Sequence, residues 1–118
     1  MRKGTMMVAL VALLVAIFAT AAYAAVIEGD GGNNDLDEST GNGVNDQMYG
    51  YGGEDRLEAW QYTDDRDKLY GGRGKDDLDV ADGDPDDVAD GGRGEESTCY
   101  ADVGDEVHRC DGNVTWFK

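Results

Sequence analysis

Glycines and carboxylates recur together through the middle of the chain, and their spacing could build a site for a hard cation. Residues 71–79 read GGRGKDDLD, in which Asp76 follows three glycines and Leu78 follows two positions later. Glycine permits positive φ and close backbone approach, so such a turn can direct several carbonyl oxygens at one point. Ca²⁺ takes about six to eight oxygen ligands, carbonyl oxygens included. The aspartate would add a charged oxygen to that set.

The same unit recurs along the chain at regular steps. Its clearest copies begin at positions 29, 41, 50, 62 and 71. A longer and a shorter step alternate, so that every second start, at positions 29, 50 and 71, is evenly spaced. Looser copies follow at residues 84–88 and 91–99. Because a fixed period is the signature of a repeat architecture, we expect one coil of two units to be the structural repeat.

Each unit ends in a very short strand, in which the middle side chain faces one way and its neighbours the other. Two units make a coil of turn, strand, turn and strand, and stacked coils form two parallel sheets around a thin core. Parallel crossovers are nearly always right-handed. We therefore predict an all-β fold, a right-handed parallel β-roll that follows an N-terminal signal helix. The predicted inward side chains are Leu36, Met48, Leu57, Leu69, Leu78 and Val88.

The unit resembles the calcium-binding nonapeptide repeat of the RTX (repeats-in-toxin, haemolysin-type) family, whose consensus is G-G-x-G-x-D-x-L-x. Residues 71–79 match every fixed position, and the resemblance covers most of residues 29–99. It implies that Ca²⁺ binds between successive turns on each side of the roll. The implied ligands are Asn34, Asp55, Asp76 and Glu96 in one row, Asp46, Asp67 and Asp86 in the other, and the turn glycines Gly50, Gly52, Gly71, Gly72 and Gly74.

The charge of the chain supports a cation as the partner. The 118 residues include 26 acidic and 10 basic side chains, for a formal net charge of −16. Nucleic acid is excluded as a partner, because its phosphates attract lysine and arginine and would be repelled here. Repulsion among the carboxylates and the thin core predict a metal-free chain that is largely disordered. The alternative is an acidic disordered polyanion that buffers cations outside the cell without one structure.

Residues 1–24 read as a secretory signal peptide of bacterial type. Arg2 and Lys3 give a positive start, residues 6–18 are almost wholly apolar, and residues 22–24 read AYA. This is the three-part pattern of an exported protein, and it predicts cleavage after Ala24, a secreted chain and no stable membrane span after cleavage. The alternative is an uncleaved apolar anchor.

Two cysteines, Cys99 and Cys110, lie in the exported part. In an oxidising compartment such a pair is most simply one disulfide, and ligation of a metal by the two thiols is the alternative. We therefore divide the chain into a signal peptide (1–24), a calcium-binding roll (25–98) and a disulfide-closed cap (99–118).

Other functions find less support in the sequence. Residues 82–87 begin like an EF-hand loop, but Asp87 stands where that loop needs glycine. His108 is the only imidazole, Ser39 and Ser97 have no histidine near them in the sequence, and the two cysteines are better used as a bridge than as a nucleophile, so we predict no enzyme activity. Trp60, with Tyr49 and Tyr70, either packs over a sheet face or forms a small aromatic patch for carbohydrate or a partner protein. We expect a structural or adhesive role at the cell surface or in a matrix.

Overall fold

A computed structural model describes residues 24–38, 44–94 and 96–118 of the chain. Short strands and the connections between them make up these ranges. The strands are β1 (Val26–Glu28), β2 (Asp35–Asp37), β3 (Gln47–Tyr49), β4 (Arg56–Glu58), β5 (Lys68–Tyr70), β6 (Arg73–Gly74), β7 (Asp77–Asp79), β8 (Val88–Asp90), β9 (Arg93–Gly94), β10 (Thr98–Asp102), β11 (Glu106–His108) and β12 (Asn113–Phe117).

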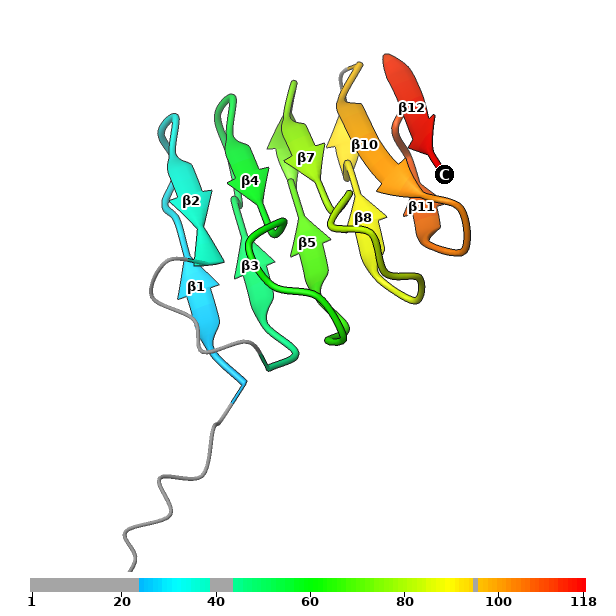
Figure 1. The fold of residues 1–118 in the computed structure, drawn as a ribbon. Coiled ribbons are helices and arrows are strands. Elements are labelled where there is room, and N and C mark those ends of the chain that lie inside the picture. Colours follow the sequence, from blue (N-terminus) through cyan, green and yellow to red (C-terminus); the bar gives the residue numbers. More distant parts are fainter. Residues whose placement is uncertain (1–23, 39–43, 95) are drawn as a thin grey trace, which may run out of the picture.

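The strands form two stacked parallel sheets, and the chain passes from one sheet to the other in each coil (Figure 1). Sheet A has the order β1-β3-β5-β8-β11, and sheet B has the order β2-β4-β7-β10-β12. A third sheet joins β6 to β9. All pairings among the described strands are parallel. The predicted all-β parallel β-roll is therefore confirmed.

The strand register follows the predicted period through the N-terminal half of the roll. In β3 and β5, Gln47 pairs with Lys68, which stands one full period of the repeat further along the chain. From β5 to β8 the interval is one residue shorter, because Lys68 pairs with Val88. It is shorter still from β8 to β11, where Val88 pairs with Glu106. Sheet A therefore loses the strict period in the C-terminal half, whereas in sheet B Asp77 still pairs with Thr98, one full period further along the chain.

The core is a thin double row of side chains between the two sheets. Four of the predicted inward side chains are fully buried, namely Met48, Leu57, Leu69 and Leu78. Leu36 is half-buried and packs against this core. The prediction for Val88 is wrong. Because the interval into β8 is one residue shorter than the period, Leu69 pairs with Ala89, and Ala89 is the buried residue of that strand.

The predicted disulfide between Cys99 and Cys110 is present, with 5.9 Å between the two Cα atoms. Cys99 lies in β10, and Cys110 lies shortly after the end of β11. Beyond the first cysteine the chain continues both sheets, because β11 pairs with β8 and β12 pairs with β10. The disulfide-closed segment is therefore stacked on the roll as its last coil.

The predicted signal helix lies in residues 1–23, outside the described part of the chain. Within residues 24–38, 44–94 and 96–118, no helix is long and apolar enough to cross a membrane.

The turns between the sheets stack so closely that glycine is required at particular places. Gly74 has a φ of +122°, and a Cβ added there would collide with the carbonyl oxygen of Gly53 in the preceding coil. Gly83 also has a positive φ of +96°, but a Cβ added there would meet nothing within 4 Å. A comparison of alanine substitutions at the two positions therefore separates the cost of a positive φ from the cost of the clash with the neighbouring coil.

We expect Gly74→Ala to destabilise the roll more than Gly83→Ala does. Both changes place a Cβ on a residue in the left-handed region, which costs about 1–2 kcal/mol, but only at Gly74 does the new atom also strike the neighbouring coil. Urea unfolding at one fixed calcium concentration measures the difference in unfolding free energy. Equal losses for the two variants would show that the turns do not stack this closely.

Candidate metal centre

Two rows of polar side chains point into the roll, each residue lying just before a strand. The glycine-turn row precedes the strands of sheet B, and its members are Asn34, Asp55, Asp76 and Ser97. The loop row precedes the strands of sheet A, and its members are Asp46, Asp67, Asp87 and Asp105. Nearly all are buried, although charged side chains are rarely buried without a partner.

One oxygen of each carboxylate in these rows is held by the neighbouring coil. The backbone N–H of Asp46 donates to Oδ1 of Asp67 at 2.7 Å, and the N–H of Asp67 donates to Oδ1 of Asp87 at 2.7 Å. In the glycine-turn row, the N–H of Asp55 donates to Oδ1 of Asp76 at 2.9 Å. A buried backbone donor needs an acceptor, so these aspartates lock each coil to the next.

In five of these carboxylates the other oxygen is buried and has no hydrogen-bond partner among the described residues, whereas in Asp105 it accepts the backbone N–H of Asp102 at 2.7 Å. The five are Oδ2 of Asp46, Asp55, Asp67, Asp76 and Asp87. Burying an unpaired charge costs several kcal/mol, so such an oxygen must carry a proton or face a cation. The orphaned oxygens therefore fit a metal ion, and oxygen is the ligand that Ca²⁺ prefers.

Glycine brings further oxygen close to the glycine-turn row. A Cβ added to Gly50 would collide with Oδ2 of Asp55 and would lie 2.6 Å from the carbonyl oxygen of Gly71. A Cβ added to Gly71 would in turn collide with Oδ2 of Asp76. Carboxylate and carbonyl oxygens of successive coils therefore converge beside these two glycines, as the repeat predicts.

The remaining predicted glycines take part in the stacking of the turns. The N–H of Gly52 donates to the carbonyl oxygen of Asp30 at 3.3 Å, and the carbonyl oxygen of Gly72 accepts from the N–H of Arg93 at 2.8 Å. The carbonyl oxygen of Gly74 accepts from the Ser97 hydroxyl at 3.4 Å.

The densest group of carboxylates, which we call the loop centre, consists of Glu38, Asp46, Asp65 and Asp67. One oxygen from each of Glu38, Asp46 and Asp67 lies within 4.8 Å of the others. Asp65 is only 3% exposed, and neither of its oxygens has a hydrogen-bond partner among the described residues. Three carboxylates at one buried place, with the charge of Asp65 close to Glu38 and Asp67, provide oxygen ligands of the kind that a hard cation takes.

Glu38 is positioned by the insert that follows β4. Its Oε1 accepts the backbone N–H of Gln61 and, at 3.2 Å, that of Tyr62. Its Oε2 is buried without a partner among the described residues. The insert that contains Trp60 therefore supplies donors to one oxygen of Glu38 and leaves the other available to a cation.

Burial raises the pKa of several of these carboxyl groups. Burial, with the charges of Asp82 and Asp105 nearby, raises the pKa of Asp87 to about 8. Burial and neighbouring carboxylates raise the pKa of Asp67 to about 7. Burial also raises the pKa of Glu38 and that of Asp65. At neutral pH Asp67 and Asp87 are therefore close to their titration range.

Most of the predicted aspartates lie where the repeat places them, but two predicted acids near the C-terminal half do not. Asp86 is exposed, has a φ of +86° and lies 3.4 Å from Arg66, and Asp87 takes its place in the loop row. Glu96 is exposed, and the shorter side chain of Ser97 takes its place in the glycine-turn row. The loop before β8 is one residue shorter than in the preceding coil, so Asp87 and not Asp86 comes directly before the strand. The glycine turn before β10 is one residue longer than the preceding one, so Ser97 and not Glu96 comes directly before the strand.

The sequence prediction missed Glu38 and Asp65. Glu38 stands one, two and three coils before buried apolar residues at the same position, namely Ala59, Val80 and Ala101. An acid at an inward position of the repeat register was the signal for Glu38. Asp65 belongs to a loop whose unit has lost its glycines, so no consensus position marked it.

A comparison with known protein families, characterised proteins and solved structures finds no match to this chain.

Without metal, we expect the roll to lose stability as the pH rises from about 5 to 8. An aspartate titrates near 3.9 in an unfolded chain, whereas Asp87 titrates at about 8 in the folded one. The folded state therefore keeps protons that the unfolded state releases, and this stabilisation, complete below about pH 4, is lost as the pH rises through 8. Thermal unfolding of the chelator-treated protein measures it.

The matched control lies next in the sequence. Asp87→Asn should weaken the pH dependence, because the amide keeps its oxygen acceptor and no longer titrates, while the exposed Asp86→Asn should leave the dependence unchanged. A midpoint that rises with pH, or equal effects of the two variants, would contradict the assignment of the buried carboxyl groups.

Proposed function

We propose that this protein is a secreted calcium-binding β-roll, in which Ca²⁺ between stacked coils drives folding. The observation that carries the proposal is the set of buried carboxylate oxygens that have no hydrogen-bond partner among the described residues. In the glycine-turn row, Asp55 and Asp76 would hold the ion together with turn carbonyls. On the loop side, Glu38, Asp46 and Asp67 of the loop centre would hold it.

The choice of calcium rests on the chemistry of these ligands. The candidate sites offer carboxylate and carbonyl oxygens in an irregular arrangement, which suits the flexible coordination of Ca²⁺ better than the strict octahedron of Mg²⁺. The resemblance of the repeat to the RTX consensus supports the same ion. A bound ion would supply positive charge that replaces the protons of the buried carboxyl groups.

The proposed role is structural or adhesive, at the cell surface or in a matrix, and not enzymatic. The signal-peptide pattern and the disulfide support export. Extracellular calcium modules commonly bind with a Kd of about 10⁻⁴–10⁻³ M, so the chain would stay unfolded where calcium is scarce and fold once it is outside the cell.

Calcium titration of the metal-free protein at pH 7.5 (roughly the pH at which Asp67 and Asp87 compete with protons) tests this proposal. We expect a cooperative change in circular dichroism with Ca²⁺ and little change with equal Mg²⁺, because stacked coils must form together. The alternative, a disordered polyanion that buffers cations, predicts a gradual and similar response to both ions. Identical spectra with chelator and with millimolar calcium would overturn the proposal.

We expect Glu38→Gln to affect the two states in opposite directions. The amide keeps the oxygen that accepts from Gln61 and Tyr62 but removes one of the mutually repelling charges of the loop centre. The metal-free protein should therefore be as stable as the wild type or more so. The stabilisation gained on adding calcium should fall by about 1–3 kcal/mol as that site weakens.

Unfolding midpoints with calcium at about pH 7.5, and with chelator at about pH 5, where protons neutralise the buried carboxyl groups and keep the metal-free roll folded, measure both effects. Glu106→Gln makes the same change at an exposed position, where the side chain is 71% accessible, and should alter neither value. Equal destabilisation of Glu38→Gln in both conditions would mean that Glu38 has only a packing role.

A further inference from the structure

A groove on the glycine-turn side of the roll has a charge opposite to that of the molecule as a whole. It has a volume of about 240 Å³. Its lining consists of Tyr51, Gly72, Arg73, Gly92, Arg93 and Arg109. Three arginines and no carboxylate therefore surround one small space in a chain of net charge −16.

The stacking of the coils places the arginines beside one another. Arg73 in β6 pairs with Arg93 in β9, so their side chains leave neighbouring parallel strands at the same level. Such strands lie about 4.8 Å apart. Both side chains are exposed, and neither forms an ion pair within the described part of the chain. Two adjacent guanidinium groups without a counter-charge form a natural anion site.

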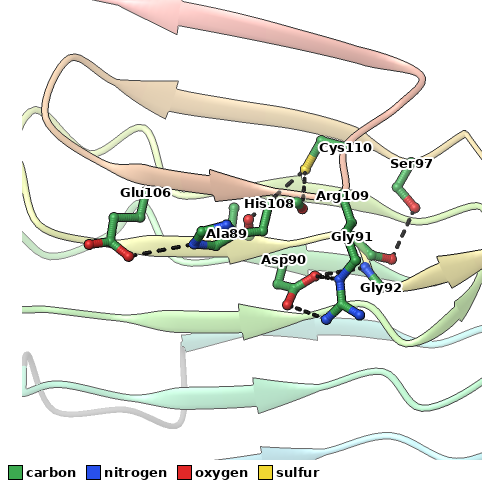
Figure 2. Close-up of polar contacts among 9 residues, drawn as sticks. All are labelled: Ala89, Asp90, Gly91, Gly92, Ser97, Glu106, His108, Arg109 and Cys110. Atoms are coloured by element: carbon green, nitrogen blue, oxygen red, sulfur yellow. Dashed lines mark hydrogen bonds and ion pairs between the residues drawn. The ribbon is translucent and has the colours of Figure 1, made fainter.

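Arg109 closes the end of the groove and is already neutralised. Figure 2 shows its guanidinium against the carboxylate of Asp90, with the Nε donating at 2.8 Å. The positive charge available in the groove therefore comes from Arg73 and Arg93.

Tyr51 lines the groove together with the two free arginines. The residue is 49% exposed, its ring stacks against that of Tyr49 with the centroids 6.0 Å apart, and its hydroxyl donates to Glu28. Tyr49 in turn stacks on Tyr70 with ring centroids 5.0 Å apart. A ligand held by the arginines would therefore meet an immobilised ring that offers apolar surface.

We propose that this groove binds an acidic sugar, with its carboxylate between Arg73 and Arg93 and one face of its ring against Tyr51. Guanidinium groups bind carboxylates through paired hydrogen bonds. A nucleic acid or another extended polyphosphate does not suit the groove, because the surrounding acidic surface would repel a long polyanion. This site goes beyond calcium binding and uses none of the candidate metal ligands except the backbone of Gly72.

Titration of the protein followed by NMR, at one fixed calcium concentration, tests the proposal with galacturonic acid as the probe. Galactose, which lacks the carboxylate, and inorganic phosphate, which lacks the ring, are the comparison ligands. We expect binding of galacturonic acid, no binding of galactose and weaker binding of phosphate. Binding of galactose equal to that of galacturonic acid would overturn the proposal, as would no binding of galacturonic acid to protein that circular dichroism shows to be folded.

Three variants separate the parts of the site. Arg73→Gln and Arg93→Gln should each weaken galacturonic acid binding about tenfold, the effect expected for a lost charged hydrogen bond. Arg66→Gln removes an equal charge from the loop side, beside Asp86, and should have little effect. Equal losses of galacturonic acid affinity for Arg66→Gln and Arg73→Gln would show that binding depends on net charge alone and would refute the site.

Tyr51→Gly tests the role of the aromatic ring with little risk to the fold. Glycine occupies the same turn position in the next two coils, as Gly72 and Gly92, and it suits the φ of +73° at Tyr51. We expect weaker binding of galacturonic acid and unchanged binding of phosphate. Unchanged binding of both would show a simple oxyanion site and refute the sugar ligand. Because circular dichroism reports folding separately, failure of this site and failure of calcium-driven folding give different results.

Discussion

The structure depends on one interaction, the hydrogen bond from a backbone N–H to the inward aspartate of the following coil. That bond is repeated at Asp46, Asp55, Asp67 and Asp76, and it fixes the level at which each coil stacks on the last. It uses only one of the two carboxylate oxygens. The other is buried by the same contact and left without a partner among the described residues. The group that sets the register of the roll is therefore also the group that creates its need for positive charge.

The sizes of the apolar and electrostatic energies show why neutralisation of the buried carboxylates decides whether the chain folds. A buried leucine contributes about 1.5–3 kcal/mol, and each coil buries only one or two large apolar side chains in the core. Two like charges about 4 Å apart repel by about 4 kcal/mol at an effective dielectric constant of 20. Repulsion between carboxylates of successive coils is thus as large as the apolar contribution of a coil. The carboxylates of the two rows must be neutralised, by protons or by metal, before burial of the apolar core can outweigh their repulsion.

The sequence predicts the roll well wherever the period of the repeat is kept. Leu57 and Leu78 are buried, and Asp55 and Asp76 share one row, because an exact period maps equivalent residues onto equivalent positions. The prediction fails at Val88 and Asp86, where the loop is one residue shorter. A run of two aspartates at Asp86 and Asp87 gives no local sign of which one turns inward, and only the pairing of β5 with β8 decides it.

The two sides of the roll differ because the two kinds of turn differ in length. The glycine turns between sheets A and B are short and tightly stacked, so their outward positions lie at neighbouring levels, and arginines there form a continuous surface. The loops that return from sheet B to sheet A are longer and can fold acidic side chains such as Glu38 and Asp65 back over the interior. An acidic chain built this way places most of its buried carboxylates on the loop side, and it presents two unpaired arginines on the glycine-turn side, where Asp55 and Asp76 are buried. A roll of identical short turns could not make that separation, so the alternation of longer and shorter units in the sequence has a consequence for binding as well as for the fold.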